Sequence, residues 1–116
     1  MKVTKTYFMV MVSEMDRALG FYRNVFGLDV QYSSREWSEL GGPNTVVALH
    51  GGRSEGPVDI GLGFEVEDLD EACAAVEAGG GEVVKPPTER EGEGFRLAIV
   101  SDPEGNRFSL AQPTQA

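Results

Sequence analysis

The 116 residues fit one domain with a modest core, because 41% of them are apolar and 25% are charged, as in ordinary globular proteins. A net charge of −9 with ten scattered basic residues argues against nucleic acid as a partner, since phosphate binding needs clustered Lys and Arg. A lone cysteine, Cys73, and an apolar run of only six residues, 7–12, predict a cytoplasmic protein with no disulfide, signal peptide or membrane span.

The first half of the chain predicts a strand, a helix and three further strands. Residues 7–12 form a short apolar run bounded by polar residues, which favours a strand. Ser13 is the expected N-cap of a helix over 15–26, with Asp16 three residues later and Gly27 as its left-handed end. The apolar stripe of this helix comprises Met15, Ala18, Leu19, Tyr22, Val25 and Phe26. Strands are expected at 28–34, 35–40 and 44–50, with the Gly-Gly-Pro run at 41–43 as the turn before the last.

The second half predicts the same order of elements. A strand at 59–66 precedes a helix over 69–79, for which Asp68 is the expected N-cap and the glycines at 79–81 the end. Leu69, Ala72, Cys73 and Val76 form the apolar stripe, so Cys73 is expected to be a packed, inert thiol. Strands follow at 82–85, 95–100 and 106–112, and the Asp-Pro-Glu-Gly-Asn run at 102–106 is typical of a tight hairpin connection.

A constant offset of 54 residues aligns the two halves without a gap over their first strand and helix. It pairs cap, stripe and helix-end positions: Glu14 with Asp68, Met15 with Leu69, Ala18 with Ala72 and Gly27 with Gly81. The prediction is a single α+β domain over 1–116, made of two tandem β-α-β-β-β modules at 1–51 and 58–116 with a linker at 52–57. Each curved mixed sheet carries a helix on one face only, so the two bare faces are expected to enclose a cleft.

Two motifs carry a family resemblance over essentially the whole chain. The stretch 12–22, Val-Ser-Glu-Met-Asp-Arg-Ala-Leu-Gly-Phe-Tyr, with Phe26-Gly27-Leu28, resembles the first-helix signature of the vicinal oxygen chelate superfamily. The run at 102–106 resembles its second signature, before the last strand. That superfamily includes glyoxalase I, extradiol dioxygenases and bleomycin-resistance proteins, so the resemblance implies the glyoxalase fold but not one activity.

The resemblance also implies four metal positions, one on the first and one on the last strand of each module. In this chain they fall on Tyr7, Ala48, Gly61 and Ser109. Divalent metals need imidazole, carboxylate or thiolate donors, so no bound metal or other cofactor is expected. The alternative is a slipped register that would bring in His50 and Asp59, each two residues from one of these positions.

Strand alternation predicts which side chains face the cleft. Aromatic and thioether groups would form its walls with a few polar groups, suited to a planar or aromatic ligand. The expected ligand-binding residues are Tyr7, Met9, Met11, Trp37, Glu39, Ala48, His50, Gly61, Glu65, Arg107 and Ser109. Packing of the methionines and Trp37 in a core or dimer contact is the competing interpretation.

The leading hypothesis is a metal-free protein that sequesters a small molecule, as drug-sequestering bleomycin-resistance proteins do. One alternative is a glyoxalase-like lyase or isomerase, or a ring-cleaving dioxygenase, with a metal recruited through His50, Asp59 or Glu65. Another is a metal-free acid–base enzyme that uses Glu39, Glu65 or His50. A homodimer whose interface helps to form the cleft is expected, because a two-fold arrangement is the commonest one for soluble proteins and the family resemblance favours it. The alternative is a monomer whose two modules close on each other.

Overall fold

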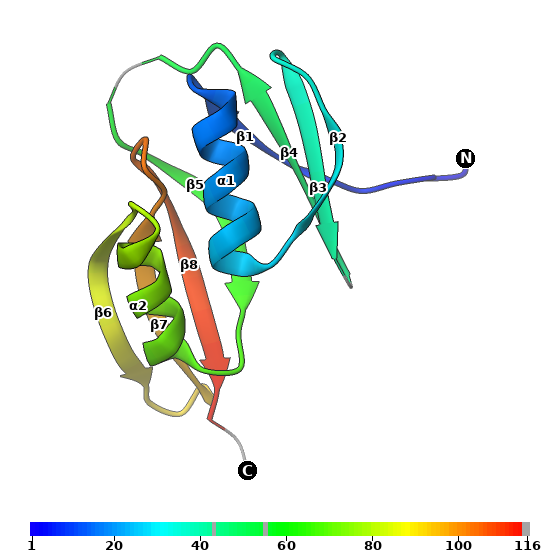
Figure 1. Cartoon of the computed structure of the whole chain (residues 1–116). Helices are drawn as coiled ribbons and strands as arrows, with labels where there is room; N and C mark the ends of the chain where they lie inside the picture. The colour runs from blue at the N-terminus through cyan, green and yellow to red at the C-terminus, as the bar shows by residue number, and fades with distance from the viewer. Residues whose placement is uncertain (43, 55, 115–116) are drawn as a thin grey trace. The chain divides into compact units, whose positions relative to one another are not determined.

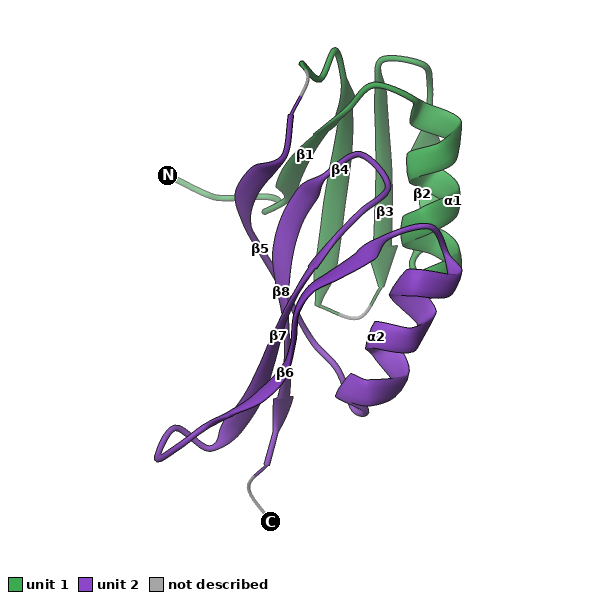
Figure 2. Ribbon diagram, turned by 90° about the vertical axis from the view of Figure 1, so that its left-hand side faces the viewer, with its two compact units in different colours: residues 1–55 green, residues 56–116 purple. Residues whose placement is uncertain are grey.

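The computed structural model describes residues 1–42, 44–54 and 56–114. The chain divides into two compact units, Met1–Glu55 and Gly56–Ala116 (Figure 2). Unit 1 contains β1 (Phe8–Val12), α1 (Met15–Phe26), β2 (Asp29–Ser33), β3 (Trp37–Gly42) and β4 (Thr45–Gly51). Unit 2 contains β5 (Val58–Glu65), α2 (Leu69–Ala78), β6 (Glu82–Arg90), β7 (Phe95–Ser101) and β8 (Asn106–Pro113). Neither helix in this described part is long and apolar enough to cross a membrane.

Each unit is a four-stranded mixed sheet, with strand order β1-β4-β3-β2 in unit 1 and β5-β8-β7-β6 in unit 2 (Figure 1). In both sheets the first strand pairs in parallel with the last strand, and the other pairings are antiparallel. Two β-α-β-β-β modules of the same topology result. The predicted fold class is therefore confirmed, and the repeated cap and stripe positions do mark equivalent places in the two modules.

In unit 1 the helix covers one face of the sheet. Alternate residues of the strands point to that face and are buried: Val10, Val12, Leu40, Val47 and Leu49. The buried residues of α1 are Met15, Ala18, Phe21 and Tyr22. The predicted stripe omitted Phe21, whose ring meets the rings of Tyr22 and Phe26 at centroid distances of 5.1 and 5.9 Å. The buried arc is thus centred closer to Phe21 than the sequence pattern indicated.

The core of unit 2 follows the predicted stripe more closely. Leu69, Cys73 and Val76 of α2 are buried, and alternate residues of the sheet are buried with them: Leu62, Ala98, Val100, Phe108 and Leu110. Burial raises the pKa of the Cys73 thiol, and the nearby Asp70 and Glu77 carboxylates raise it further. The thiol is therefore protonated and unreactive, as expected from its place on the stripe.

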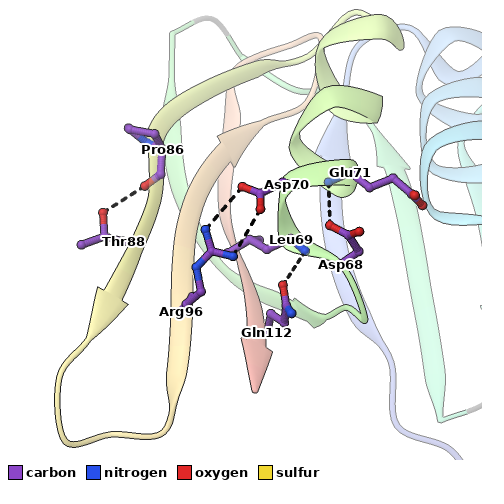
Figure 3. Close-up of polar contacts among 8 residues, drawn as sticks. All are labelled: Asp68, Leu69, Asp70, Glu71, Pro86, Thr88, Arg96 and Gln112. Atoms are coloured by element: carbon purple, nitrogen blue, oxygen red, sulfur yellow. Dashed lines mark hydrogen bonds and ion pairs between the residues drawn. The ribbon is translucent and has the colours of Figure 1, made fainter. Parts of the chain in front are cut away.

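The two helices begin differently. Ser13 is not the N-cap of α1: Glu14 occupies that position and its side chain makes no capping hydrogen bond. In α2 the expected cap is present, because Asp68 Oδ1 accepts a hydrogen bond of 3.0 Å from the Glu71 N–H (Figure 3). A second first-turn donor, the Leu69 N–H, reaches Gln112 Oε1 on β8 at 2.7 Å. These two contacts satisfy N–H groups that have no partner within a helix.

Both helices end at glycines, as the sequence predicted. Gly27 adopts a left-handed conformation, with φ of 68°, and its N–H donates to the carbonyl oxygen of Arg23. At the end of α2 the left-handed residue is Gly80, with φ of 99°, while Gly79 keeps a negative φ. In both helices a residue without Cβ thus turns the chain toward the next strand.

Two strand boundaries differ from the prediction. Gly41 and Gly42 belong to β3 and pair with Val46 and Thr45, so they are not turn residues. Pro43, the rest of that predicted turn, lies outside the described residues, as does Glu55 of the predicted linker. Strand β6 runs to Arg90, well beyond the predicted end at Lys85.

The prolines at 86 and 87 are the reason that β6 was predicted too short. A proline cannot donate to a strand ladder, but β6 is an edge strand, and its register shifts between Lys85 and Thr88. The Thr88 hydroxyl donates to the Pro86 carbonyl oxygen at 3.1 Å (Figure 3). The irregular stretch is thereby accommodated and regular pairing resumes beyond it.

The connection between β7 and β8 is held by a buried polar pair. Asp102 Oδ1 accepts from the N–H groups of Glu104 and Asn106, and Oδ2 accepts from the Asn106 side-chain amide at 2.8 Å. Asp102 and Asn106 are 3% and 1% exposed, so water cannot replace these hydrogen bonds. The motif at 102–106 is therefore a structural one that fixes where β8 begins.

We expect Asp68→Ala to destabilise the protein by about 1 kcal/mol, because the Glu71 N–H would lose its side-chain acceptor. The matched control is Glu14→Ala at the equivalent position of α1, where no cap hydrogen bond exists and the change should stay within about 0.5 kcal/mol. Urea unfolding of both variants measures the difference. Equal losses would show that the Asp68 cap contributes nothing specific.

Asp102→Ala should cost about 3 kcal/mol, because it removes the buried carboxylate that accepts from the Asn106 amide and from two backbone N–H groups. Asp102→Asn is the milder variant: it keeps an oxygen for the two backbone donors but removes the acceptor of the Asn106 amide. The shift in the urea midpoint should therefore be clearly smaller for Asn than for Ala. The reverse order would contradict the account of this turn.

Candidate functional site

The face of the unit 1 sheet opposite α1 carries most of the predicted ligand-binding residues. In the ladder, Met9, Ala48 and Glu39 stand side by side, and Met11, His50 and Trp37 form the next row. Side chains in one row point to the same face, and rows two residues apart share that face. Tyr7, directly before β1, lies beside Trp37. We call this surface the Trp37 face; it comprises Tyr7, Met9, Met11, Trp37, Glu39, Ala48 and His50.

Three aromatic rings meet on the Trp37 face. The Trp37 ring is perpendicular to both of its neighbours, with centroid distances of 5.6 Å to Tyr7 and 5.8 Å to His50. Such edge-to-face contacts are favourable and fix the ring orientations. Tyr7 is 49% and Met9 45% exposed in the isolated chain, which is unusual for side chains of this size. Ala48 on this face is fully buried, whereas Tyr7 and Met9 present apolar surface to solvent.

Glu39 is the polar centre of this face. Its Oε2 accepts a hydrogen bond of 2.8 Å from the Trp37 indole N–H, and its Oε1 lies 2.6 Å from Lys5 Nζ. The hydrogen bond from Lys5 lowers the pKa of Glu39, and the bond from Trp37 lowers it further against a smaller opposing effect of burial. Glu39 is therefore a carboxylate at neutral pH and is not suited to act as a general acid.

Lys5 was not among the predicted site residues. It belongs to the N-terminal segment before β1, and no apolar alternation marks that segment as part of a strand. The sequence offered one signal. If the extended chain of β1 continues toward the N-terminus, odd-numbered residues share a face, and Lys5 lies on the same side as Tyr7, Met9 and Met11.

Tyr32 is the second residue that sequence reasoning missed. The register of β2 shifts between Val30 and Tyr32, so Tyr32 pairs with Glu39 in the ladder and lies at the border of the Trp37 face, 58% exposed. The neighbouring Gln31 side chain lies over Gly41, where an added Cβ would come within 2.5 Å of Gln31 Nε2. A bulge of this kind cannot be read from a simple alternation of residues.

The predicted residues of unit 2 are found on the face of its sheet opposite α2. Ser109 pairs with Gly63, and an added Cβ at Gly63 would lie only 2.9 Å from Ser109 Oγ. Arg107 pairs with Asp59 in the ladder, and its Nε lies 2.8 Å from Asp59 Oδ1. Glu65 is exposed near the end of β5, and Gly61 lies where the β5 register shifts. Leu97 and Ile99, which pair with Ala111 and Ser109, add apolar groups that were not predicted.

The four positions that the family resemblance assigns to a metal do not fit one. Ala48 and Gly61 have no side-chain donor, and the Tyr7 and Ser109 hydroxyls are poor ligands for divalent metals. Within residues 1–42, 44–54 and 56–114, no three His, Cys, Asp or Glu side chains are grouped so that they could hold a metal ion. Of the alternative ligands, Asp59 is paired with Arg107, and His50 Nδ1 contacts the carbonyl oxygen of Gly51.

Relatives of known sequence point to one family. The lactoylglutathione lyase GLX1 of Arabidopsis thaliana is 34% identical over 87% of this chain and 41% of that protein. A probable lactoylglutathione lyase of Synechocystis is 28% identical over 90% of this chain and 91% of that protein. The chain thus spans about two fifths of the plant relative and nearly all of the cyanobacterial one.

Solved structures share the fold. The fosfomycin resistance protein FosX of Listeria monocytogenes superposes with a TM-score of 0.79 at 19% identity, over 98% of this chain and 96% of that one. A variant of that protein was crystallised with Mn(II) and a dihydroxypropylphosphonic acid. A superfamily member from Sphaerobacter thermophilus superposes with a TM-score of 0.74 at 27% identity, over 94% of this chain and 98% of that one.

The sequence itself matches the Glyoxalase/Bleomycin resistance protein/Dioxygenase superfamily over residues 6–110, which include both signatures and, at least in part, every strand and helix of the described residues. Family match, duplicated topology and superposition with solved members agree. The chain belongs to the glyoxalase/bleomycin resistance protein/dioxygenase superfamily.

Proposed function

We propose that this protein binds a planar or aromatic small molecule without a metal, and that the Trp37 face holds the ligand. The observation that carries the proposal is the group of three rings, Tyr7, Trp37 and His50, on an exposed sheet face. Rings at fixed, perpendicular angles give a flat ligand one surface for stacking and another for edge contacts. The thioethers of Met9 and Met11 supply adaptable apolar contact beside them.

A comparison of the two sheets supports the choice of this face. The face of the unit 2 sheet opposite α2 carries Gly63 directly beside Ser109. The Arg107 guanidinium on this face is already paired with Asp59. The aromatic residue of this face in the described part of β7 is Phe95, which pairs with Pro113 at the end of the ladder, away from Ser109. The cleft between modules, a homodimer and a cytoplasmic location, all expected from the sequence, stay predictions.

The second candidate is a metal-dependent lyase. It is favoured by the 34% identity to a protein named lactoylglutathione lyase. Against it stands the donor set: Ala48 and Gly61 occupy two of the four family metal positions and can contribute no side-chain ligand. A site missing two of four ligands would not compensate the cost of desolvating a divalent ion. We therefore rank binding above lyase chemistry.

Metal content distinguishes the two candidates. Protein purified without chelators and without metal-affinity resin should contain far less than one equivalent of zinc, nickel, iron or manganese by elemental analysis. Addition of each metal to the purified protein should leave the melting temperature unchanged, because a ligand that binds only the folded state would raise it. A near-stoichiometric metal content, or a metal-specific rise in melting temperature, would favour the lyase.

The role of Trp37 can be tested directly, because it is the only tryptophan of the chain. Planar aromatic compounds that bind the Trp37 face should quench its fluorescence. Calorimetry should then show an affinity about fivefold to tenfold lower for Trp37→Ala, since an aromatic pair contributes about 1 kcal/mol. Trp37→Phe is the matched variant, which retains a stacking ring and should lose less. Equal affinities of wild type and Trp37→Ala would exclude this face as the site.

A further inference from the structure

The contact between Lys5 and Glu39 holds a positive charge directly on the Trp37 face. Lys5 Nζ lies 2.6 Å from Glu39 Oε1, and the other carboxylate oxygen is held by the Trp37 indole N–H. The Glu39 side chain is only 19% exposed, whereas that of Lys5 is 47% exposed. The carboxylate is thus fixed within the sheet, and the ammonium group approaches it from the solvent side.

Lys5 is held much less firmly than Glu39. Glu39 is paired within the ladder with Ala48 on one side and Tyr32 on the other. The pairing of β1 with β4 begins only at Phe8, so Lys5 lies in a segment before the first paired residue. An ion pair with one exposed, loosely held partner contributes little to stability, and another cation can replace that partner at small cost.

The surroundings of this position suit an organic cation better than a neutral or anionic group. The Trp37 indole N–H donates a hydrogen bond to the Glu39 carboxylate, and the Trp37 ring meets Tyr7 at a centroid distance of 5.6 Å, so a cation bound to Glu39 would lie next to aromatic rings. Aromatic faces attract cations. The net charge of −9 also raises the local concentration of cations around the protein. His50, the other titratable nitrogen group of the face, meets Trp37 and does not contact Glu39 in any of the described interactions.

We propose that the ligand of the Trp37 face is a planar organic cation, whose positive group replaces the Lys5 ammonium on Glu39 while its ring system lies against Trp37 and Tyr7. This inference rests on the proposed function and specifies its ligand class. Lys5 is then an internal competitor: it occupies the cation position in the free protein and must leave when ligand binds. Loss of the Lys5 charge should therefore strengthen binding of cations and leave binding of neutral rings unchanged.

Three probes that share one ring system test the charge preference. N-methylacridinium is a cation, acridine is neutral at pH 8, and acridine-9-carboxylate is an anion. Each is titrated into the full chain at one fixed salt concentration, with binding followed by quenching of Trp37 and by calorimetry. The wild-type protein should bind the cation most tightly and the anion most weakly. Glu39→Gln keeps an oxygen for the Trp37 N–H but removes the charge, and should abolish the preference for the cation.

Lys5→Gln and Lys2→Gln separate the specific contact from general charge. Both variants change the net charge equally and lie in the same N-terminal segment, but Lys5 alone is the one that contacts Glu39 in the structure. Lys5→Gln should raise the affinity for N-methylacridinium about twofold to fivefold, the range expected for an exposed ion pair, and leave that for acridine unchanged. Lys2→Gln should change neither.

Failure of this inference and failure of the proposed function look different. If all three rings bind and quench Trp37 equally well, or if the two lysine variants shift the affinities alike, the cation inference is wrong and the proposed function stands. If none of the rings binds wild type or Lys5→Gln, both are wrong.

Discussion

Pairing of the first strand with the last strand in parallel completes the sheet of each unit, and the rest of the structure depends on it. These strands are far apart in the sequence, so the helix and two antiparallel strands between them must form a compact crossover. The register fixes which side chains share a face. A slip of one residue in β1 would bury Met9 and Met11 and expose Val10 and Val12.

The two faces of each sheet have different roles: the inner face is covered by the helix, and the outer face lies opposite it. The inner faces must fit a helix, and both units fill them with aliphatic and aromatic side chains of similar kind. On the outer face of unit 1, the position of Glu39 orders the polar groups: the indole N–H of Trp37 and the Lys5 ammonium both point to it. The Glu39 carboxylate thus orients the Trp37 ring and also attracts a positive charge, and the proposal of a cationic ligand depends on it.

Periodicity predicted most of the fold and much of the candidate site. Both helices, the eight strands and the shared face of Met9, Trp37, Glu39 and His50 follow from spacings of 3.6 and two residues. Features that break the period were missed. The bulge that brings Tyr32 beside Glu39, the continuation of β6 past two prolines, and the contact of Lys5 from outside any strand depend on tertiary neighbours. The prediction of Ser13 as the N-cap was wrong, because Glu14 is the residue directly before the first helical residue.

The 54-residue repeat has a consequence for how such a protein can diversify. In an assembly of identical single modules, every mutation appears on all copies at once, so each copy must present the same outer face. Fusion of two modules in one chain removes that restriction, because each copy then mutates independently. The two sheets do differ: rings surround Trp37 on one, whereas Gly63 pairs with Ser109 on the other. One module can therefore change the side chains of its outer face while the other keeps small ones, although both have the same topology.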